Sequence, residues 1–205
     1  MACLAINLVK GVSDLMIDQR SEKRLSDSEL NDYIEALSRG ETNAMAPLYQ
    51  ATSPGVYAYA LSVLKNTQDA QDVLHDTYVS VYTAAARYHS MGKPMAWIMT
   101  IAKNHCLKLL KQRQRNSDMS LEEWSDSADL MTFMRSDEKL LLRHCMKSLA
   151  DQERQIVVLH AVAGFKHHEI ASILRIPLPT VLSKYSRAIQ KLRNLLEKED
   201  SSYEK

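Results

Sequence analysis

Residues 167–192 read HHEIASILRIPLPTVLSKYSRAIQKL, two short segments with helical periodicity separated by a turn that holds two prolines. Apolar residues recur at three- and four-residue steps through both segments, which predicts one buried stripe. Its members are Ile170, Ala171, Leu174, Ile176, Leu178, Val181, Leu182, Tyr185, Ile189, Leu192 and Leu196. Pro179 lies near the first helical position of the second segment, where an amide has no intrahelical partner to lose. The stretch therefore predicts a helix-turn-helix.

The opposite face of the second helix is polar, cationic and free of carboxylates. Its members are Thr180, Ser183, Lys184, Arg187 and Lys191. In a helix-turn-helix the second helix enters the major groove, where its first residues reach base edges and its basic residues reach phosphates. We therefore expect this face to bind duplex DNA. An ordinary helical hairpin with a solvated face would show the same pattern, so the motif alone leaves both readings open.

Two earlier segments extend this motif to a C-terminal four-helix unit over residues 139–197, followed by a polar tail at 198–205. One helix is expected at residues 139–149. The apolar stretch 155–163 predicts another, with Asp151 as its N-cap, Glu153 in its first turn and Gly164 as its stop. His167 and His168 are expected to be solvated, because HHEIAS lacks the second histidine of a zinc-binding HExxH motif.

Charge is arranged in three blocks, although the net charge of the chain is only +1. Residues 87–115 hold seven basic side chains and no acidic one; residues 116–138 hold seven acidic and one basic; residues 154–196 hold seven basic and one acidic. Two basic modules joined by an acidic linker suggest two contacts to one polyanion, with the linker held away from it. Charge alone would also fit two solvated helical surfaces.

The composition predicts an all-α protein, with two small helical domains joined by the acidic linker. Only five glycines and five prolines occur in 205 residues, and 45% of the residues are hydrophobic. No apolar run is long enough to span a membrane and no persuasive signal peptide opens the chain, so we expect a cytoplasmic location. Cys3, Cys106 and Cys145 are odd in number and widely spaced, which favours reduced structural thiols.

The segment that follows Asn66 predicts a helix that runs to about Arg87, with Asn66 as its N-cap. The expected buried stripe comprises Ala70, Val73, Leu74, Thr77, Tyr78, Val81, Tyr82 and Ala85. Asp69, Asp72 and Asp76 then share an exposed side, which is either solvated or docks on a basic protein partner. No His, Ser or Cys is spaced to join them on one face, so we discount an enzyme site.

Residues 93–115, KPMAWIMTIAKNHCLKLLKQRQR, predict a helix that starts at Pro94. The inward positions are Ile98, Ile101, Ala102, His105 and Leu109, and a second carboxylate-free face holds Asn104, Lys108, Lys111 and Arg115. Four aromatic residues precede or begin this helix, namely Tyr78, Tyr82, Tyr88 and Trp97. Aromatic side chains near a basic surface suit stacking on unpaired bases, although we expect Tyr78 and Tyr82 to lie in the core.

Three segments carry a resemblance to a known family. They are VYAYALSVLKNTQDAQDVLHDTYVSVYTAAARY at 56–88, KPMAWIMTIAKNHCLKLLK at 93–111 and SLADQERQIVVLHAVAGFKHHEIASILRIPLPTVLSKYSRAIQKLR at 148–193. Their order, with an acidic DAQD segment, an AWI…IAKN helix, an acidic linker and a terminal helix-turn-helix, resembles bacterial RNA polymerase sigma factors of the small extracytoplasmic-function (ECF) group. The resemblance covers about residues 42–196.

The resemblance implies a role for each face. Residues 42–115 would be sigma region 2, residues 139–197 region 4, and the linker 116–138 would pass near the RNA path. Asp69, Asp72 and Asp76 would dock on the clamp coiled coil of the largest subunit of core RNA polymerase. The start-proximal promoter element would be contacted by Tyr88, Lys93, Trp97, Lys103, Asn104 and Lys108. The upstream element would be contacted by Thr180, Ser183, Lys184, Arg187 and Lys191. An anti-sigma factor is an expected partner, and no catalytic residue, cofactor or metal is implied.

The sequence departs from the family pattern at three positions. Arg175 and Pro179 stand where the family has glycine, and Leu182 stands where it has lysine, so turn geometry and upstream recognition are open questions. Residues 1–41 form an unassigned N-terminal extension. The apolar linker residues Trp124, Leu130, Met131, Phe133 and Met134 are expected to hold the two domains together in an inactive form. Other function classes are a dimeric, polymerase-independent helix-turn-helix regulator and a metal-dependent hydrolase.

Overall fold

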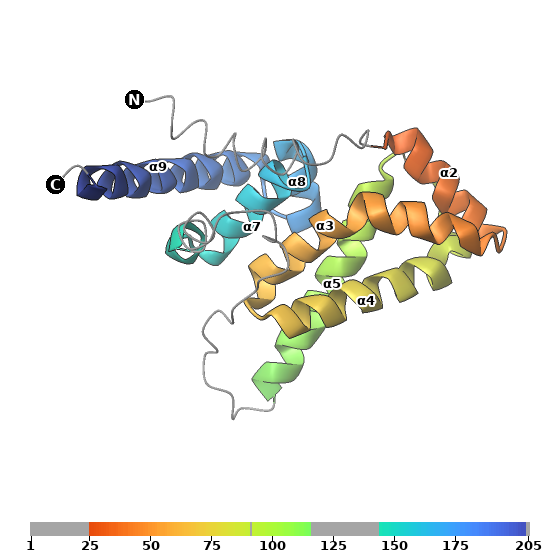
Figure 1. The fold of residues 1–205 in the computed structure, drawn as a ribbon. Coiled ribbons are helices and arrows are strands. Elements are labelled where there is room, and N and C mark those ends of the chain that lie inside the picture. The colour runs from red at the N-terminus through yellow and green to blue at the C-terminus, as the bar shows by residue number, and fades with distance from the viewer. Residues whose placement is uncertain (1–24, 91, 116–143, 204–205) are drawn as a thin grey trace. The chain divides into compact units, whose positions relative to one another are not determined.

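The described part of the protein is entirely helical in its regular structure. A computed structural model describes residues 25–90, 92–115 and 144–203, which fall into two compact units, 25–115 and 144–203. Figure 1 shows helices and connecting loops in both units. The predicted all-α fold with two helical domains is confirmed. The linker 116–138 and residues 1–24, Cys3 included, lie outside the described residues.

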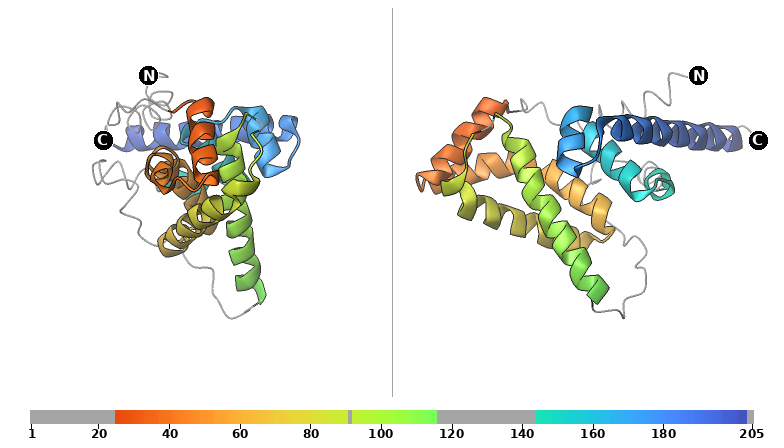
Figure 2. Two further views of the ribbon diagram at one scale, coloured as in Figure 1. Left: turned by 90° about the vertical axis from the view of Figure 1, so that its right-hand side faces the viewer. Right: turned by 180° about the vertical axis from the view of Figure 1, so that it is seen from behind.

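The first unit is built around α3. Its elements are α2 (Asp27–Ser38), η1 (Thr42–Ala44), α3 (Met45–Leu64), α4 (Thr67–Ala84), η2 (Ala85–Arg87) and α5 (Pro94–Arg115). Helix α3 packs against α2, α4 and α5, an arrangement visible from two sides in Figure 2. It is therefore buried over much of its circumference, with Leu48, Val56 and Ala60 fully enclosed. Thr52 of α3 and the Tyr78 hydroxyl of α4 lie 2.6 Å apart and join these two helices.

Capping residues set two helix starts in this unit. Asn66 caps α4 as predicted, because its side chain accepts the Asp69 amide at 3.0 Å. Helix α2 lies within the stretch that the sequence left unassigned. It starts at a capping box in which Ser26 and Glu29 satisfy each other's backbone amides. Three apolar residues one turn apart, Leu30, Ile34 and Leu37, are buried on this helix.

The second unit is a small helical bundle, with helical residues 144–148, α7 (Asp151–Ala161), α8 (His167–Leu174) and α9 (Leu178–Tyr203). Its core contains Cys145, Leu149, Val157, Ala188 and Leu192, with Met146, Tyr185 and Ile189 packed against them. One detail differs from the sequence prediction, because the N-cap of α7 is Ala150 and not Asp151. Helix α9 continues to Tyr203, so it includes residues 198–203 of the predicted polar tail.

Several residues that were predicted to lie in the core are exposed, because they lie at the margin of the apolar side of their helix. Tyr78 is buried as expected, but Tyr82 is 45% exposed, and on α9 Leu178 and Leu182 are 39% and 46% exposed. Neighbouring helices cover only one side of α4 and of α9, so the residues at the margin of a wide apolar stripe stay in contact with water. On α5 the predicted inward residues Ile98 and Ala102 are fully buried, and Met99 and Cys106, which periodicity had not placed inward, are buried beside them. Cys106 is a free thiol, as expected.

Candidate nucleic-acid interface

The helix-turn-helix has the predicted form. Helices α8 and α9 flank a turn in which Arg175 adopts a left-handed conformation, with φ 56° and ψ 48°. The amide of Ile176 donates to the Ala171 carbonyl at 3.1 Å, which closes the end of α8. A side chain in this region of backbone space costs about 1 kcal/mol or more relative to glycine. Arg175 therefore keeps the turn geometry without the glycine.

The predicted upstream-element residues follow one side of α9. Ser183 and Arg187 are exposed, and the Arg187 guanidinium folds back to donate to the Ser183 carbonyl at 3.3 Å. Thr180 and Lys184 are half-buried. No acidic residue occurs on α9 before Glu197, so this side of the helix has no competing carboxylate of its own.

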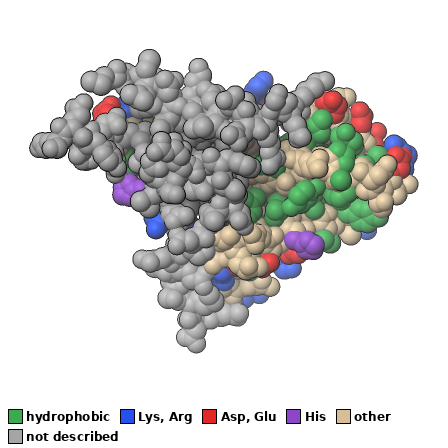
Figure 3. Space-filling model, in the orientation of Figure 1, with side chains coloured by type: hydrophobic (Ala, Val, Ile, Leu, Met, Phe, Trp, Pro, Cys, Tyr) green, Lys and Arg blue, Asp and Glu red, His purple; other side chains and the backbone are tan. Residues whose placement is uncertain are grey.

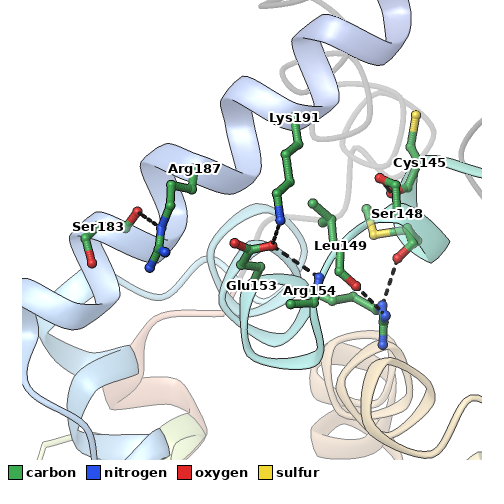
Figure 4. A network of polar contacts seen from close by, with 10 residues as sticks. Cys145, Ser148, Leu149, Glu153, Arg154, Ser183, Arg187 and Lys191 are labelled. Atoms are coloured by element: carbon green, nitrogen blue, oxygen red, sulfur yellow. Dashed lines mark hydrogen bonds and ion pairs between the residues drawn. The ribbon is translucent and has the colours of Figure 1, made fainter.

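Lys191 differs from the other members of this face, because its ammonium is engaged within the unit. Its Nζ donates to Oε2 of Glu153 on α7 at 2.7 Å (Figure 4). Glu153 is only 5% exposed in its side chain, and it also accepts the Ala150 amide at 3.1 Å. Burial opposes its ionisation, but the hydrogen bonds from Lys191 and Ala150 outweigh burial and lower the pKa of Glu153. This pair fixes α9 against α7.

Arg154 also belongs to the interior, although the charge pattern had counted it with the basic surface. Its guanidinium is buried and donates to the carbonyls of Met146 at 2.9 Å and Leu149 at 2.7 Å (Figure 4). It also donates to the Asp151 carboxylate at 3.1 Å. These bonds satisfy the carbonyls at the end of the preceding helix. Arg154 therefore holds the start of α7 rather than a polyanion.

His167 is not a solvated helix-start residue, which corrects the sequence prediction. Its ring stacks on His160 of α7, with ring centroids 4.5 Å apart, and both rings contact Tyr185 of α9 edge-on. Nδ1 of His160 lies 2.9 Å from the Phe165 carbonyl, which can only accept, so this nitrogen carries the proton. Burial and the neighbouring His160 lower the pKa of His167. The three rings join all three named helices of this unit.

In the first unit, Tyr88 and Trp97 form an aromatic pair at the start of α5. Their ring centroids are 4.6 Å apart, and both side chains are half-buried. The Tyr88 hydroxyl donates to Oδ1 of Asn31 on α2 at 2.5 Å. Burial raises the pKa of Tyr88, so the hydroxyl keeps its proton at neutral pH. The loop that leads to exposed Lys93 is therefore fixed to α2, a contact that sequence spacing does not reveal.

Helix α5 then extends the surface away from this pair. Asn104 and Lys108 are exposed and lie on the same side as Trp97, and Lys111 and Arg115 continue that line. Lys103 is half-buried and projects to a different side, because consecutive helical residues do not share a face. The structure thus brings five of the six predicted start-proximal residues to one end or one side of α5.

The predicted acidic ridge on α4 is smaller than expected. Asp72 and Asp76 are exposed, but Asp69 is only 16% exposed in its side chain and forms an ion pair with Arg113 of α5. Exposed Val79 lies on the same side of α4, one turn beyond Asp76. Figure 3 shows hydrophobic side chains over part of the visible surface of this unit. The outward side of α4 therefore combines the carboxylates of Asp72 and Asp76 with the exposed Val79 side chain.

Two protein-family models match the chain in the order of its two units. The model described as Sigma-70 region 2 matches residues 48–116, and the one described as Sigma-70, region 4 matches residues 139–192. Curated relatives are named ECF RNA polymerase sigma factor SigK. The protein of Mycobacterium ulcerans is 26% identical over 176 residues, covering 82% of this chain and 94% of the relative. That of Mycobacterium bovis is 25% identical over 181 residues, covering 85% and 96%. The chain belongs to the ECF group of the sigma-70 family.

Solved structures resemble this sigma factor in fold. One is described as CnrH in complex with the cytosolic domain of CnrY, with a TM-score of 0.58, 22% identity and coverage of 83% of this chain and 98% of that one. Another is the sigma factor RpoE in complex with the anti-sigma factor NepR from Bartonella quintana, with a TM-score of 0.58, 23% identity and coverage of 73% and 94%. Both likenesses support the all-helical architecture.

The sigma factor also brings together three side chains that sequence spacing had kept apart. Ser80 Oγ lies 2.9 Å from Nε2 of His105, and Nδ1 of His105 lies 4.0 Å from the Asp76 carboxylate. The second distance is too long for a hydrogen bond. Ser80 also lies within α4, where the backbone amides are bonded inside the helix and none is left for an oxyanion. The group does not have the geometry of a hydrolase site.

Within 25–90, 92–115 and 144–203, no three His, Cys, Asp or Glu side chains are grouped so that they could ligate a metal ion. The helices of those ranges also include none with the length and apolar character needed to cross a membrane.

Proposed function

We propose that this sigma factor binds core RNA polymerase, directs it to a restricted set of promoters and helps to open the start-proximal element. The observation that carries the proposal is the Tyr88–Trp97 pair at the start of an exposed cationic line, in a chain that also has a helix-turn-helix. Aromatic rings suit unpaired bases and a helix-turn-helix suits duplex DNA. A regulator that only binds a duplex operator needs no surface for unpaired bases.

The proposal assigns upstream recognition to α9. Thr180, Ser183, Lys184 and Arg187 supply hydroxyl and cationic donors along one side of a helix without acids before Glu197. Their contacts would divide between base edges near the start of α9 and phosphates further along it. Lys191 is the weakest member of this predicted set, because its ammonium already binds Glu153.

Start-proximal contacts are assigned to the first unit. Tyr88 and Trp97 would stack against a base that has left the duplex, and Lys93, Asn104 and Lys108 would hold the backbone. Lys103 projects elsewhere and is a weaker candidate. Binding energy alone would favour the melted state, so the proposed function includes no enzymatic step and no cofactor.

Core polymerase binding is assigned to the outward side of α4. Asp72 and Asp76 would meet a basic surface on the clamp coiled coil of the largest subunit, and Val79 adds apolar area beside them. Asp69 would contribute less, because Arg113 compensates its charge. The functional domains are proposed as residues 42–115 and 139–197, and the protein would act in the cytoplasm, where polymerase and DNA are.

An anti-sigma partner is a further element of the proposal. The two solved structures named above are described as complexes, that of CnrH with the cytosolic domain of CnrY and that of the sigma factor RpoE with the anti-sigma factor NepR. We propose that a protein inhibitor likewise covers part of the surfaces of this chain. Co-purification of a stoichiometric partner that blocks polymerase binding would support this assignment.

Run-off transcription on fragmented genomic DNA tests the main proposal. Purified core polymerase is assayed with and without the full chain, and transcript starts are mapped. New starts that share an upstream and a start-proximal sequence are expected. An Asp72→Asn, Asp76→Asn variant should lose core binding, whereas Asp32→Asn, a matched change at an exposed position of α2, should keep it. Tight binding to a palindromic site without polymerase, and no new starts, would instead establish the dimeric regulator.

A further inference from the structure

Helix α9, the second helix of the helix-turn-helix, exposes two large apolar side chains near its N-terminal end. This is the end that such a motif inserts into the major groove of DNA. Leu178 is 39% exposed and Leu182 46% exposed. They lie four residues apart, so they project from the same side of α9, and Ser186 continues that side one turn later. The free unit leaves this apolar surface in water, which is unfavourable unless a partner covers it.

The surroundings of these leucines favour a nucleic acid as the partner. Arg193 follows on the same side of α9 as Ser186, and Arg187 is also exposed close by. The first acidic residue of α9 is Glu197, about four turns beyond Leu182. An apolar patch at the N-terminal end of a cationic helix is complementary to a polyanion that presents an apolar group in its groove.

Only one base offers such a group in the major groove. Thymine carries a C5-methyl there, whereas the other bases present hydrogen-bond donors and acceptors to a side chain that enters. We infer that Leu178 and Leu182 form a specificity surface that contacts thymine methyl groups in the upstream promoter element. This inference rests on the proposed function, and it gives the leucines a role where a lysine would instead contact phosphate or guanine.

The test removes the methyl group and nothing else. Promoters found by run-off transcription are synthesised with each upstream-element thymine replaced singly by deoxyuridine, and the affinity of the complete holoenzyme is measured. We expect the wild-type holoenzyme to lose about fourfold in affinity for at least one such replacement. Leu182→Ala should bind thymine and uracil equally at that position, whereas Leu182→Met, which keeps volume and apolarity, should retain the difference.

A matched control separates a local contact from a general loss of apolar surface. Leu107 on α5 is 43% exposed and lies in the other unit, so Leu107→Ala should retain full sensitivity to uracil. Equal wild-type affinity for thymine and uracil at every position would overturn the inference. An upstream element that contains no thymine would also overturn it. The same holds if the Leu182→Ala variant binds core polymerase more weakly than wild type in the absence of DNA. Absence of any new transcript start would instead defeat the proposed function itself.

Discussion

Helices α5 and α9 carry similar charge patterns but lie in different surroundings. Each has a carboxylate-free side with lysine and arginine at helical spacing. On α5 this side begins at an aromatic pair, whereas on α9 it begins at two exposed leucines and its Lys191 is bound to a buried glutamate. A repeated charge pattern therefore predicts contact with a polyanion, but the neighbouring helices decide which form of nucleic acid each surface suits.

The largest expected effect comes from a substitution that destabilises the second unit and leaves the first unit folded. Arg154→Ala removes a buried guanidinium, so the Leu149 carbonyl loses this donor and the Met146 carbonyl keeps only the Leu149 amide at 3.4 Å. We expect a loss of about 3 kcal/mol in the free energy of unfolding of this unit, which would abolish upstream recognition. Urea unfolding followed by circular dichroism measures it. Arg187→Ala, at an exposed site, is the control, and equal stability of the two variants would contradict the structural role of Arg154.

The second prediction concerns the aromatic pair. Trp97→Ala should reduce promoter opening about tenfold or more, because stacking on one base contributes roughly 1–3 kcal/mol. Permanganate reactivity of promoter thymines in the holoenzyme complex measures opening, and duplex binding through the helix-turn-helix should be unchanged. Trp97→Phe should recover part of the activity. A variant that opens promoters normally would assign the pair to packing of the Tyr88 loop against α2.

The third prediction distinguishes two cations on the same helix. Arg187→Ala should reduce the slope of log affinity against log salt by about 1, as expected for the loss of one phosphate contact. Lys191→Ala should leave that slope nearly unchanged and lower stability instead, because the partner of its ammonium is Glu153. Equal loss of slope in both variants would show that Lys191 leaves Glu153 when DNA binds.

The smallest predicted effect is a pH dependence of the second unit. The folded state lowers the pKa of His167 through burial and the neighbouring His160, with Tyr185 as the third ring against it. The unfolded chain therefore takes up a proton more readily, so stability is complete above pH 6.5 and falls as the pH drops from there towards the lowered pKa. Melting curves should show this fall as the pH is lowered through and below 6.5. His167→Phe should flatten it, whereas a variant at exposed His168 should not.

Periodicity and capping predicted the elements of this fold better than their contacts. The helix-turn-helix, the Asn66 cap and burial of Tyr78 follow from local spacing, which a helix obeys whatever surrounds it. Exposure of Tyr82 and Leu182 does not follow from local spacing, because only the positions of neighbouring helices decide how wide a stripe is covered. The Asp69–Arg113 and Glu153–Lys191 pairs join residues 44 and 38 positions apart, and no local signal connects them.

The Asn31–Tyr88 contact affects how this protein can be divided into fragments. A fragment cut at residue 42, where the resemblance begins, would lack α2 and with it the acceptor for the Tyr88 hydroxyl. The surfaces that had enclosed Leu30, Ile34 and Leu37 would also be opened to water. A fragment for crystallisation or for single-stranded DNA binding should therefore start before Ser26, so that the capping box of α2 is retained.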